Sequence, residues 1–253
     1  MIFDSHAHLD HRRFDEDREE IFSSLSAAGV GSVMNIGCDL TSSLKSVALA
    51  EKYPFVYAAV GSHPDDAGSF TEATAKMYEN LAKNPRVRAI GEIGLDYYYD
   101  DNPPQVQKVC FLRQMELAQE VGLPVILHDR DAHGDTLDIV RRFPGVKGVF
   151  HCYSGSAEMA QEVVKLGYYV GFTGVITFKN ARKAVQALQA VPLDRILVET
   201  DCPYMAPEPH RGKRCDSRLL PFTLEKMAAF RGISYEEMVR ITEENAKRLF
   251  GIA

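Results

Sequence analysis

Short apolar runs alternate with longer amphipathic stretches along this chain. The runs are rich in β-branched residues, aromatics and glycine, which is typical of strands, and several are almost continuously apolar. Continuous apolar runs are expected where both faces of a parallel sheet are buried. The predicted strands lie near 2–6, 31–36, 55–61, 87–92, 124–128, 146–151, 168–173 and 195–200.

The amphipathic stretches predict helices between the strands. The last of them begins with a candidate capping box, because Ser234 is followed three residues later by Glu237. The predicted helices lie near 15–28, 41–52, 72–83, 105–121, 134–142, 156–166, 180–189, 217–230 and 234–249.

Strands that alternate with helices indicate an α/β protein built from parallel β/α units. Eight such units in a chain of 253 residues favour a closed (β/α)8 TIM barrel over an open doubly wound sheet. No Gly- or Ser-rich linker interrupts the pattern, so we expect one barrel domain over residues 1–253.

Composition narrows the class of function. The net charge of −6 argues against a protein that coats nucleic acid nonspecifically, although local grip on a phosphate stays possible. The five cysteines are odd in number and lack a C-x-x-C pair, so we expect no disulfide framework and a reduced, cytoplasmic location. No apolar run is long enough to span a bilayer, and no G-x-G-x-x-G is present, so we expect neither membrane association nor an organic cofactor.

Imidazole and carboxylate side chains stand at successive ends of the predicted strands. In a (β/α)8 barrel these ends form one rim, which holds the active site. A single histidine at a strand end is more often a hydrogen-bonded structural residue than a ligand, but six buried groups without partners would be costly. We therefore predict a metal centre at this rim, with ligands His6, His8, Glu92, His128, His151 and Asp201.

The spacing of these residues suggests their roles. Side chains two apart on a strand point to the same face, so His6 and His8 can reach one ion. Glu92 has two oxygens and can bridge two ions, whereas Asp201 can bind one ion and accept a proton from water. Imidazole combined with carboxylate suits divalent Mg, Mn or Zn.

Motifs that contain these ligands and other residues are spread along nearly the full length of the chain. They are DSHAHLD at 4–10, VGSHP at 60–64, IGEIGLDYYYD at 90–100, LPVILHDRDAHGDTL at 123–137, FHCYSG at 150–155, ILVETDCPYMAP at 196–207, RGKR at 211–214 and ENAKRLF at 244–250. In these motifs and their order the sequence resembles the TatD-like deoxyribonucleases, a family of metal-dependent hydrolases in the amidohydrolase superfamily.

The resemblance implies a two- or three-metal phosphodiesterase centre on the same six ligands, with Glu92 as the bridge. It also places His63, from the G-x-H-P segment, in the pocket, where it contacts the scissile phosphate or assists proton transfer; the alternative is a structural cap. The implied activity is hydrolysis of DNA phosphodiester bonds, exonuclease-like, from a 3′ end or on single strands. Catalytic roles therefore fall on Asp201, Glu92 and His63.

The sequence departs from the family pattern at one residue and in one segment of three residues. Asp65 stands where a histidine usually follows G-x-H-P, and Cys215, Asp216 and Ser217 replace the usual Asn-Glu-Pro. Because the second segment follows the last predicted strand, we expect it to line the mouth of the barrel and to alter substrate preference.

Basic and aromatic residues near the rim are candidates for substrate binding. Arg130 can pair with a phosphate, or instead with Asp129 or Asp131. The tyrosines at 97–99 can stack nucleobases or pack against loops. The remaining candidates form a basic cluster that is either a phosphate site or a solvated charge run: Arg211, Lys213 and Arg214.

Two alternatives stay open. An amidohydrolase-type enzyme acting on a small amide, lactone or phosphoester would use the same rim, but it would not need the basic cluster. A non-catalytic binding barrel would have no need of six ligands. We expect a monomer in either case.

Overall fold

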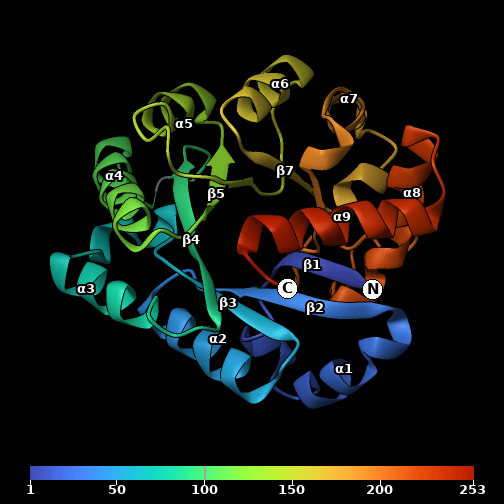
Figure 1. The fold of residues 1–253 in the computed structure, drawn as a ribbon, viewed down its shortest axis with the longest axis horizontal. Helices are drawn as coiled ribbons and strands as arrows, with labels where there is room; N and C mark the ends of the chain where they lie inside the picture. Colours follow the sequence, from blue (N-terminus) through green and yellow to red (C-terminus); the bar gives the residue numbers. More distant parts are fainter. Residues whose placement is uncertain (100) are drawn as a thin grey trace.

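A computed structural model describes residues 1–99 and 101–253, so Asp100, the last residue of the 90–100 motif, lies outside the described residues. The strands form one 8-stranded parallel sheet in sequence order, which curls into a nearly closed barrel and confirms the predicted (β/α)8 fold (Figure 1). The strands are β1 (Ile2–Ala7), β2 (Val30–Ile36), β3 (Val56–Val60), β4 (Val87–Asp96), β5 (Val125–Arg130), β6 (Gly148–Phe150), β7 (Tyr169–Phe172) and β8 (Ile196–Val198).

Helices surround the sheet on its outer face (Figure 1). Their inward stripes pack on the outward-facing strand residues in one large apolar core. The α-helices are α1 (Arg18–Ser24), α2 (Leu40–Lys52), α3 (Glu72–Leu81), α4 (Pro104–Val121), α5 (His133–Val140), α6 (Ala157–Lys165), α7 (Arg182–Ala190), α8 (Leu220–Arg231) and α9 (Tyr235–Phe250).

A second apolar core fills the inside of the barrel. One residue or more from each strand contributes, and the end of α9 closes the cluster with Leu249 and Phe250. Phe250 stacks on Phe3 of β1 with ring centroids 6.0 Å apart. Because α9 closes the end where the strands begin, the opposite rim is the end left for chemistry.

Several element boundaries differ from the predictions. The expected helix at 15–28 is only α1, flanked by 3-10 turns at Arg12–Phe14 and Ser26–Ala28, and it ends at Gly29, whose φ of 81° suits glycine. Strands β6 and β8 are shorter than predicted, and β4 continues four residues past Glu92. Ser234 does cap α9, since its hydroxyl accepts the Glu237 amide at 3.1 Å.

The barrel closes between its first and last strands by a short seam. β8 ends at Val198, and the chain beyond it runs beside β1. The Asp201 amide donates to the His6 carbonyl and the His8 amide donates to the Cys202 carbonyl, both at 2.9 Å. This seam places Asp201, the last proposed ligand along the chain, beside His6 and His8, the first two.

All five cysteines are free thiols. No helix in the described ranges, 1–99 and 101–253, combines the length and the apolar character needed to cross a membrane.

Candidate metal centre

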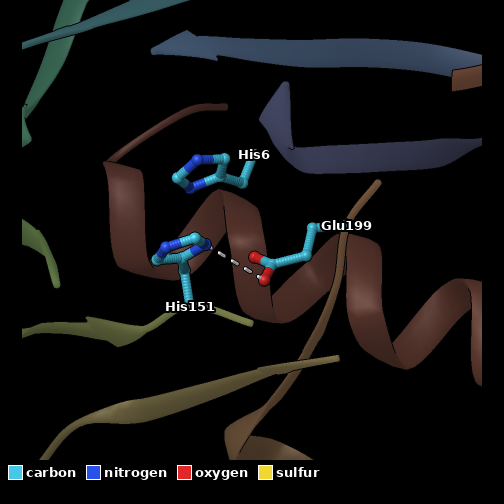
Figure 2. A group of neighbouring side chains, drawn as sticks. All are labelled: His6, His151 and Glu199. Carbon is cyan, nitrogen blue, oxygen red and sulfur yellow. Dashed lines mark ion pairs between the residues drawn. The ribbon is translucent and has the colours of Figure 1, made fainter. Parts of the chain in front are cut away.

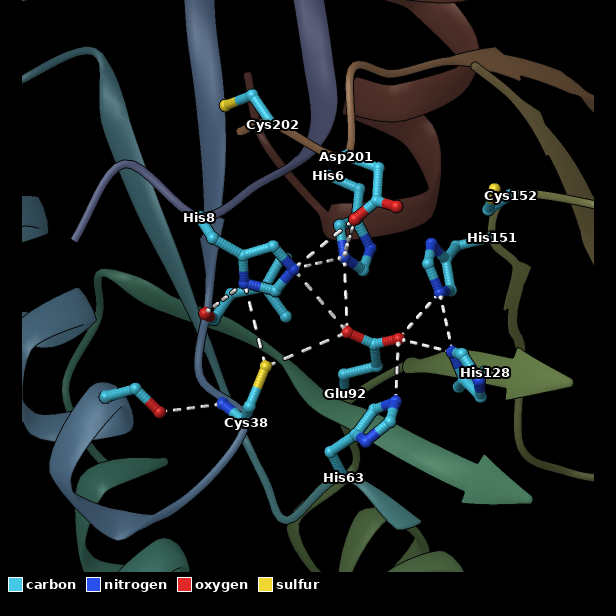
Figure 3. A network of polar contacts seen from close by, with 12 residues as sticks. His6, His8, Cys38, His63, Glu92, His128, His151, Cys152, Asp201 and Cys202 are labelled. Atoms are coloured by element: carbon cyan, nitrogen blue, oxygen red, sulfur yellow. Dashed lines mark hydrogen bonds and ion pairs between the residues drawn. The ribbon is translucent and has the colours of Figure 1, made fainter. Parts of the chain in front are cut away.

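The six predicted ligands converge at the rim where the strands end (Figure 3). His6 Nε2 lies 3.1 Å from His8 Nε2, and Asp201 Oδ1 lies 3.5 Å from the same His8 nitrogen. On the opposite side of Glu92, His128 Nδ1 lies 3.3 Å from His151 Nε2. These donors therefore form two groups, each with two imidazole nitrogens.

Glu92 stands between the two groups. Its Oε2 lies 3.3 Å from His6 Nε2 and 3.7 Å from His8 Nε2. Its Oε1 lies 2.6 Å from His151 Nε2 and 2.9 Å from His128 Nδ1. The two carboxylate oxygens thus face different imidazoles, an arrangement that would let Glu92 contact two ions.

Strand geometry explains how the ligands reach the rim. His6 and His8 follow one another with one residue between, so both side chains point inward. Gly94 lets β4 and β5 approach closely, because a Cβ there would lie 2.0 Å from the His128 carbonyl oxygen, and its φ is 143°. Asp201 adopts φ of 56°, a left-handed conformation that aspartate tolerates better than most residues.

The electrostatics of the cluster favour a charged centre. Burial would raise the pKa of Glu92, but the histidines around it, His151 and His6 foremost, hold that pKa well below its usual value. Burial lowers the pKa of His6, whereas His128 has its pKa raised to about 9, because contacts with Asp96 and Glu92 outweigh burial. Glu92 is thus a buried, ionised carboxylate that is surrounded by imidazoles.

The donor set fits divalent ions. Three sets of residues each bring their donor atoms within 4.8 Å of one another. The sets are His6, His8 and Glu92; His63, Glu92 and His128; and His6, His151 and Glu199. Imidazole nitrogens and carboxylate oxygens together are donors for divalent ions, so the cluster is suited to Mg, Mn or Zn.

His63 lies at this centre, as the sequence predicted. Its Nε2 is 3.7 Å from Glu92 Oε1. Its Nδ1 accepts the Asp65 amide at 3.2 Å, so His63 also caps the 3-10 turn Pro64–Ser69. The carboxylate of Asp65, which replaces the usual histidine, lies 3.4 Å from the same nitrogen. His63 is therefore the structural cap that was the alternative interpretation, and its position beside Glu92 also leaves the predicted role in the pocket open.

Three residues near the centre were not predicted. Asp96 Oδ2 lies 2.8 Å from His128 Nε2, on the side away from Glu92. Cys38 Sγ lies 3.7 Å from His8 Nδ1 and 3.9 Å from Glu92 Oε2, and burial raises the pKa of this thiol to about 11. Cys38 follows β2, so its position at a strand end was the available signal.

Glu199 is the third unpredicted residue, and it is fully buried. Its Oε1 lies 3.7 Å from His151 Nδ1, and the His151 ring stacks on His6 with centroids 3.9 Å apart (Figure 2). Gly171 makes room for it, since a Cβ there would lie 2.6 Å from Glu199 Oε2. The signal for Glu199 was its place two residues before Asp201, in the E-T-D of the last strand end.

The substrate-binding candidates contact different parts of the chain. The guanidinium of Arg130 lies over the ring of Tyr98, 3.8 Å from its centroid. The guanidinium of Arg211 lies over the Phe178 ring, 4.2 Å from its centroid, and Lys213 is exposed. Arg214 forms an ion pair with Asp17 and donates to the Arg13 carbonyl at 2.6 Å. Within the predicted basic cluster, Arg214 is therefore engaged by a carboxylate.

The segment at 215–217 does not line the mouth, contrary to the expectation from sequence. Cys215, Asp216 and Ser217 are all buried. Ser217 Oγ donates to Asp4 Oδ2 at 2.7 Å, and Asp216 pairs with Arg218 at 2.8 Å. The segment packs inward because it fastens the chain after β8 to β1, a contact across more than two hundred residues that local pattern does not reveal.

The chain is similar to known proteins over nearly its whole length. The family described as "TatD related DNase" matches residues 3–251. The chain is 42% identical over 254 residues to the "uncharacterized metal-dependent hydrolase YabD" of Bacillus subtilis, with 100% of both chains covered. It is 34% identical to the "3'-5' ssDNA/RNA exonuclease TatD" of Klebsiella pneumoniae, covering 99% of this chain and 98% of that one. The crystal structure of YJJV, a TatD homolog from Escherichia coli K12, superposes with a TM-score of 0.94 at 29% identity, covering 100% of this chain and 98% of that chain.

Proposed function

This chain belongs to the TatD family of metal-dependent hydrolases, and on that premise we propose that it is a nuclease that hydrolyses phosphodiester bonds in DNA. We infer that it acts on single strands from the 3′ end, with two or three divalent ions. Relatives named as 3'-5' ssDNA/RNA exonucleases support this choice of substrate and direction. The ions would be held by His6, His8, Glu92, His128, His151 and Asp201.

The position of Glu92 carries the proposal. Its two oxygens face different imidazoles, at 2.6 to 3.7 Å. When bound, a pair of divalent ions would supply electrophilic stabilisation of both the attacking and the leaving oxygen of a phosphoryl displacement. Glu92 would help to hold these ions as an ionised carboxylate, and the surrounding imidazoles keep it in that state.

The chain's own residues divide the remaining tasks. Asp201 is positioned to orient the attacking water and accept its proton, because its carboxylate faces His6 and His8 at the edge of the cluster. His63 lies beside Glu92 and can donate a hydrogen bond to a phosphate oxygen. Arg130, two residues after His128 on the same face of β5, supplies positive charge at the rim.

Variants at Glu92 and Asp201 test the proposal. Purified protein, loaded in turn with Mg²⁺, Mn²⁺ and Zn²⁺, is incubated with labelled single- and double-stranded DNA and RNA. We expect 3′ shortening of single strands, slowed by about 10²–10⁴-fold in Glu92→Gln and Asp201→Asn. Glu116→Gln, on the exposed face of α4, is the matched control and keeps the full rate. Full activity in either site variant contradicts the proposed mechanism. If no nucleic acid is cleaved with any of the three metals, the proposed substrate is wrong.

A second candidate substrate class is favoured by one observation. Arg214 is held by Asp17, which leaves less free positive charge at the mouth than the sequence suggested. A small amide, lactone or phosphoester would not need that charge. Reversing Arg211 and Lys213 to glutamate separates the two cases, because it should slow nuclease activity and leave hydrolysis of a neutral amide or lactone unchanged.

A further inference from the structure

Two exposed tyrosines and one arginine lie together at the rim beside the proposed centre. Tyr98 and Tyr99 expose 57% and 48% of their surface, and their rings meet edge to face with centroids 4.9 Å apart. The Arg130 guanidinium lies 3.8 Å from the Tyr98 ring centroid and 4.9 Å from that of Tyr99. These three residues are called the tyrosine–arginine platform below.

The neighbouring tyrosine behaves differently. The hydroxyl of Tyr97 donates to Asp135 at 2.8 Å, and its ring packs against the apolar core. Packing against a loop, the structural alternative for these tyrosines, therefore describes Tyr97 and not the two that follow it. Tyr98 and Tyr99 instead present aromatic surface and a cation to solvent, which suits a planar, anionic ligand.

Asp96 ties the platform to the metal centre. Its Oδ1 accepts the Tyr98 amide at 2.9 Å and the Tyr99 amide at 3.2 Å. Its Oδ2 lies 2.8 Å from Nε2 of His128, whose other nitrogen faces Glu92. The side chains of Asp96 and His128 thus connect the backbone of the platform to Glu92.

The sheet fixes the arginine in the same frame. Asp96 is paired directly with Arg130 across β4 and β5, and the Tyr97 amide donates to the Arg130 carbonyl at 2.9 Å. Arg130 and His128 lie two residues apart on β5, so their side chains share the face that points to the mouth. The pairing of β4 with β5 therefore holds the platform in place beside the proposed centre.

We propose that the tyrosine–arginine platform is a nucleotide subsite, which stacks one base of a single strand and pairs its phosphate with Arg130. The proposal rests on the proposed nuclease function and deepens it. A base in a duplex is stacked on both faces by its neighbours, whereas an unpaired base can offer a face to a tyrosine or to a guanidinium plane. Single-stranded substrate is thus selected by the platform rather than by the metals.

Strands with one missing base test the subsite. The metal-loaded enzyme is given a labelled single strand, and the same strand with one abasic residue at each of the three 3′-terminal positions in turn. We expect one of these positions to raise KM by about 5- to 150-fold, the range for loss of one stacked base. Tyr98→Ala or Tyr99→Ala should raise KM on the intact strand by a similar factor.

Non-additivity is the decisive result. In the alanine variants the sensitive abasic position should cause little further loss, because the partner of the missing base is already gone. Tyr98→Phe keeps a stacking ring and should raise KM less than Tyr98→Ala does. Val109→Ala, at an exposed side chain of α4, is the control and should keep the KM of the unchanged protein. Arg130→Gln should weaken intact and abasic strands by equal factors, as a phosphate contact does. Thermal unfolding confirms that each variant is folded.

The outcomes separate the two proposals. Cleavage of DNA with an unchanged KM in both tyrosine variants overturns the platform and leaves the nuclease proposal standing. Additive losses from Tyr98→Ala and the abasic residue also overturn it, since the two changes would then act at different places. No cleavage of any nucleic acid by the unchanged protein overturns both.

Discussion

The Asp96 carboxylate lies 2.8 Å from Nε2 of His128, and Nδ1 of the same ring lies 2.9 Å from Glu92. Nε2 carries the proton that Asp96 accepts. With an ion bound at the centre the ring would be neutral, and its Nδ1 lone pair would face that ion. A carboxylate behind a ligand histidine raises its basicity and holds its orientation.

Replacing Asp96 by asparagine should therefore weaken metal binding while leaving the six ligands in place. We expect a loss of about 10- to 100-fold in affinity for the ion nearest His128, the range for an outer partner of a ligand histidine. Titration of chelator-stripped protein by calorimetry measures the effect. Asp138→Asn, on the exposed face of α5, is the control. An unchanged affinity would show that Asp96 serves only the tyrosine backbone.

Metal removal should lower the stability of the folded protein. The buried imidazoles and carboxylates of the centre lose their ligand, and an ion that binds only the folded state adds about 2.7 kcal/mol when its concentration is a hundred times its Kd. The melting temperature should fall on treatment with a chelator and recover with added Zn²⁺ or Mn²⁺, rising further with metal concentration. A melting temperature that neither the chelator nor added metal changes would contradict the proposed ligand set.

His133 should contribute to stability in a pH-dependent manner. Its Nδ1 lies 2.8 Å from Asp129 Oδ2, and this hydrogen bond raises the pKa of His133 above its usual value. A raised pKa means that the contribution is complete below about pH 6.5, the unfolded value, and is lost as pH rises through the folded value. His133→Gln should thus cost more unfolding free energy at pH 5.5 than at pH 8.5, by less than about 1 kcal/mol because the ring is partly exposed.

Gly171 should not tolerate a side chain. A Cβ at this position would lie 2.6 Å from Glu199, which is fully buried against His151 and cannot swing into solvent. We expect Gly171→Ala to destabilise the protein by about 1–3 kcal/mol in chemical denaturation, as overpacking does. Gly134, in α5, has open space around its Cβ position, so Gly134→Ala should stabilise by up to about 1 kcal/mol. Equal effects from the two substitutions would argue against the clash.

Ser217 should matter for stability rather than for substrate choice. Its hydroxyl donates to Asp4 at 2.7 Å, and burial raises the pKa of that aspartate to about 7 despite the hydrogen bonds it accepts. Ser217→Ala leaves a buried acceptor short of one donor and should cost about 1–3 kcal/mol. Ser23→Ala, on the exposed surface of α1, should cost little. A change in cleavage preference without a loss of stability would restore the view that this segment reads the substrate.

The sequence predicted those parts of the molecule that depend on local patterns of apolar and polar residues. All eight strands could be located because apolar runs mark strands that are buried on both faces, and strand ends then singled out His6, Glu92 and His151. Contacts formed through side chains far apart in sequence were not visible in this way. Asp96 and Glu199 lie next to predicted ligands, yet their partners, His128 and His151, are set by the register between strands. Strands β6 and β8 were also predicted too long, because the polar residues that follow them, His151 and Glu199, lie outside the strands.

The seam between β1 and the chain after β8 has a consequence for how the protein is made. Under the proposed ligand set, His6 and His8 leave the ribosome first, while Asp201 follows only after nearly two hundred further residues. The backbone pairing of Asp201 with His6 then joins these groups. A nascent or prematurely terminated chain lacks the last ligand and cannot assemble the complete centre. Under the proposed function, hydrolytic activity is therefore confined to chains whose synthesis has passed the last strand, and an unfinished chain would not cleave nucleic acid.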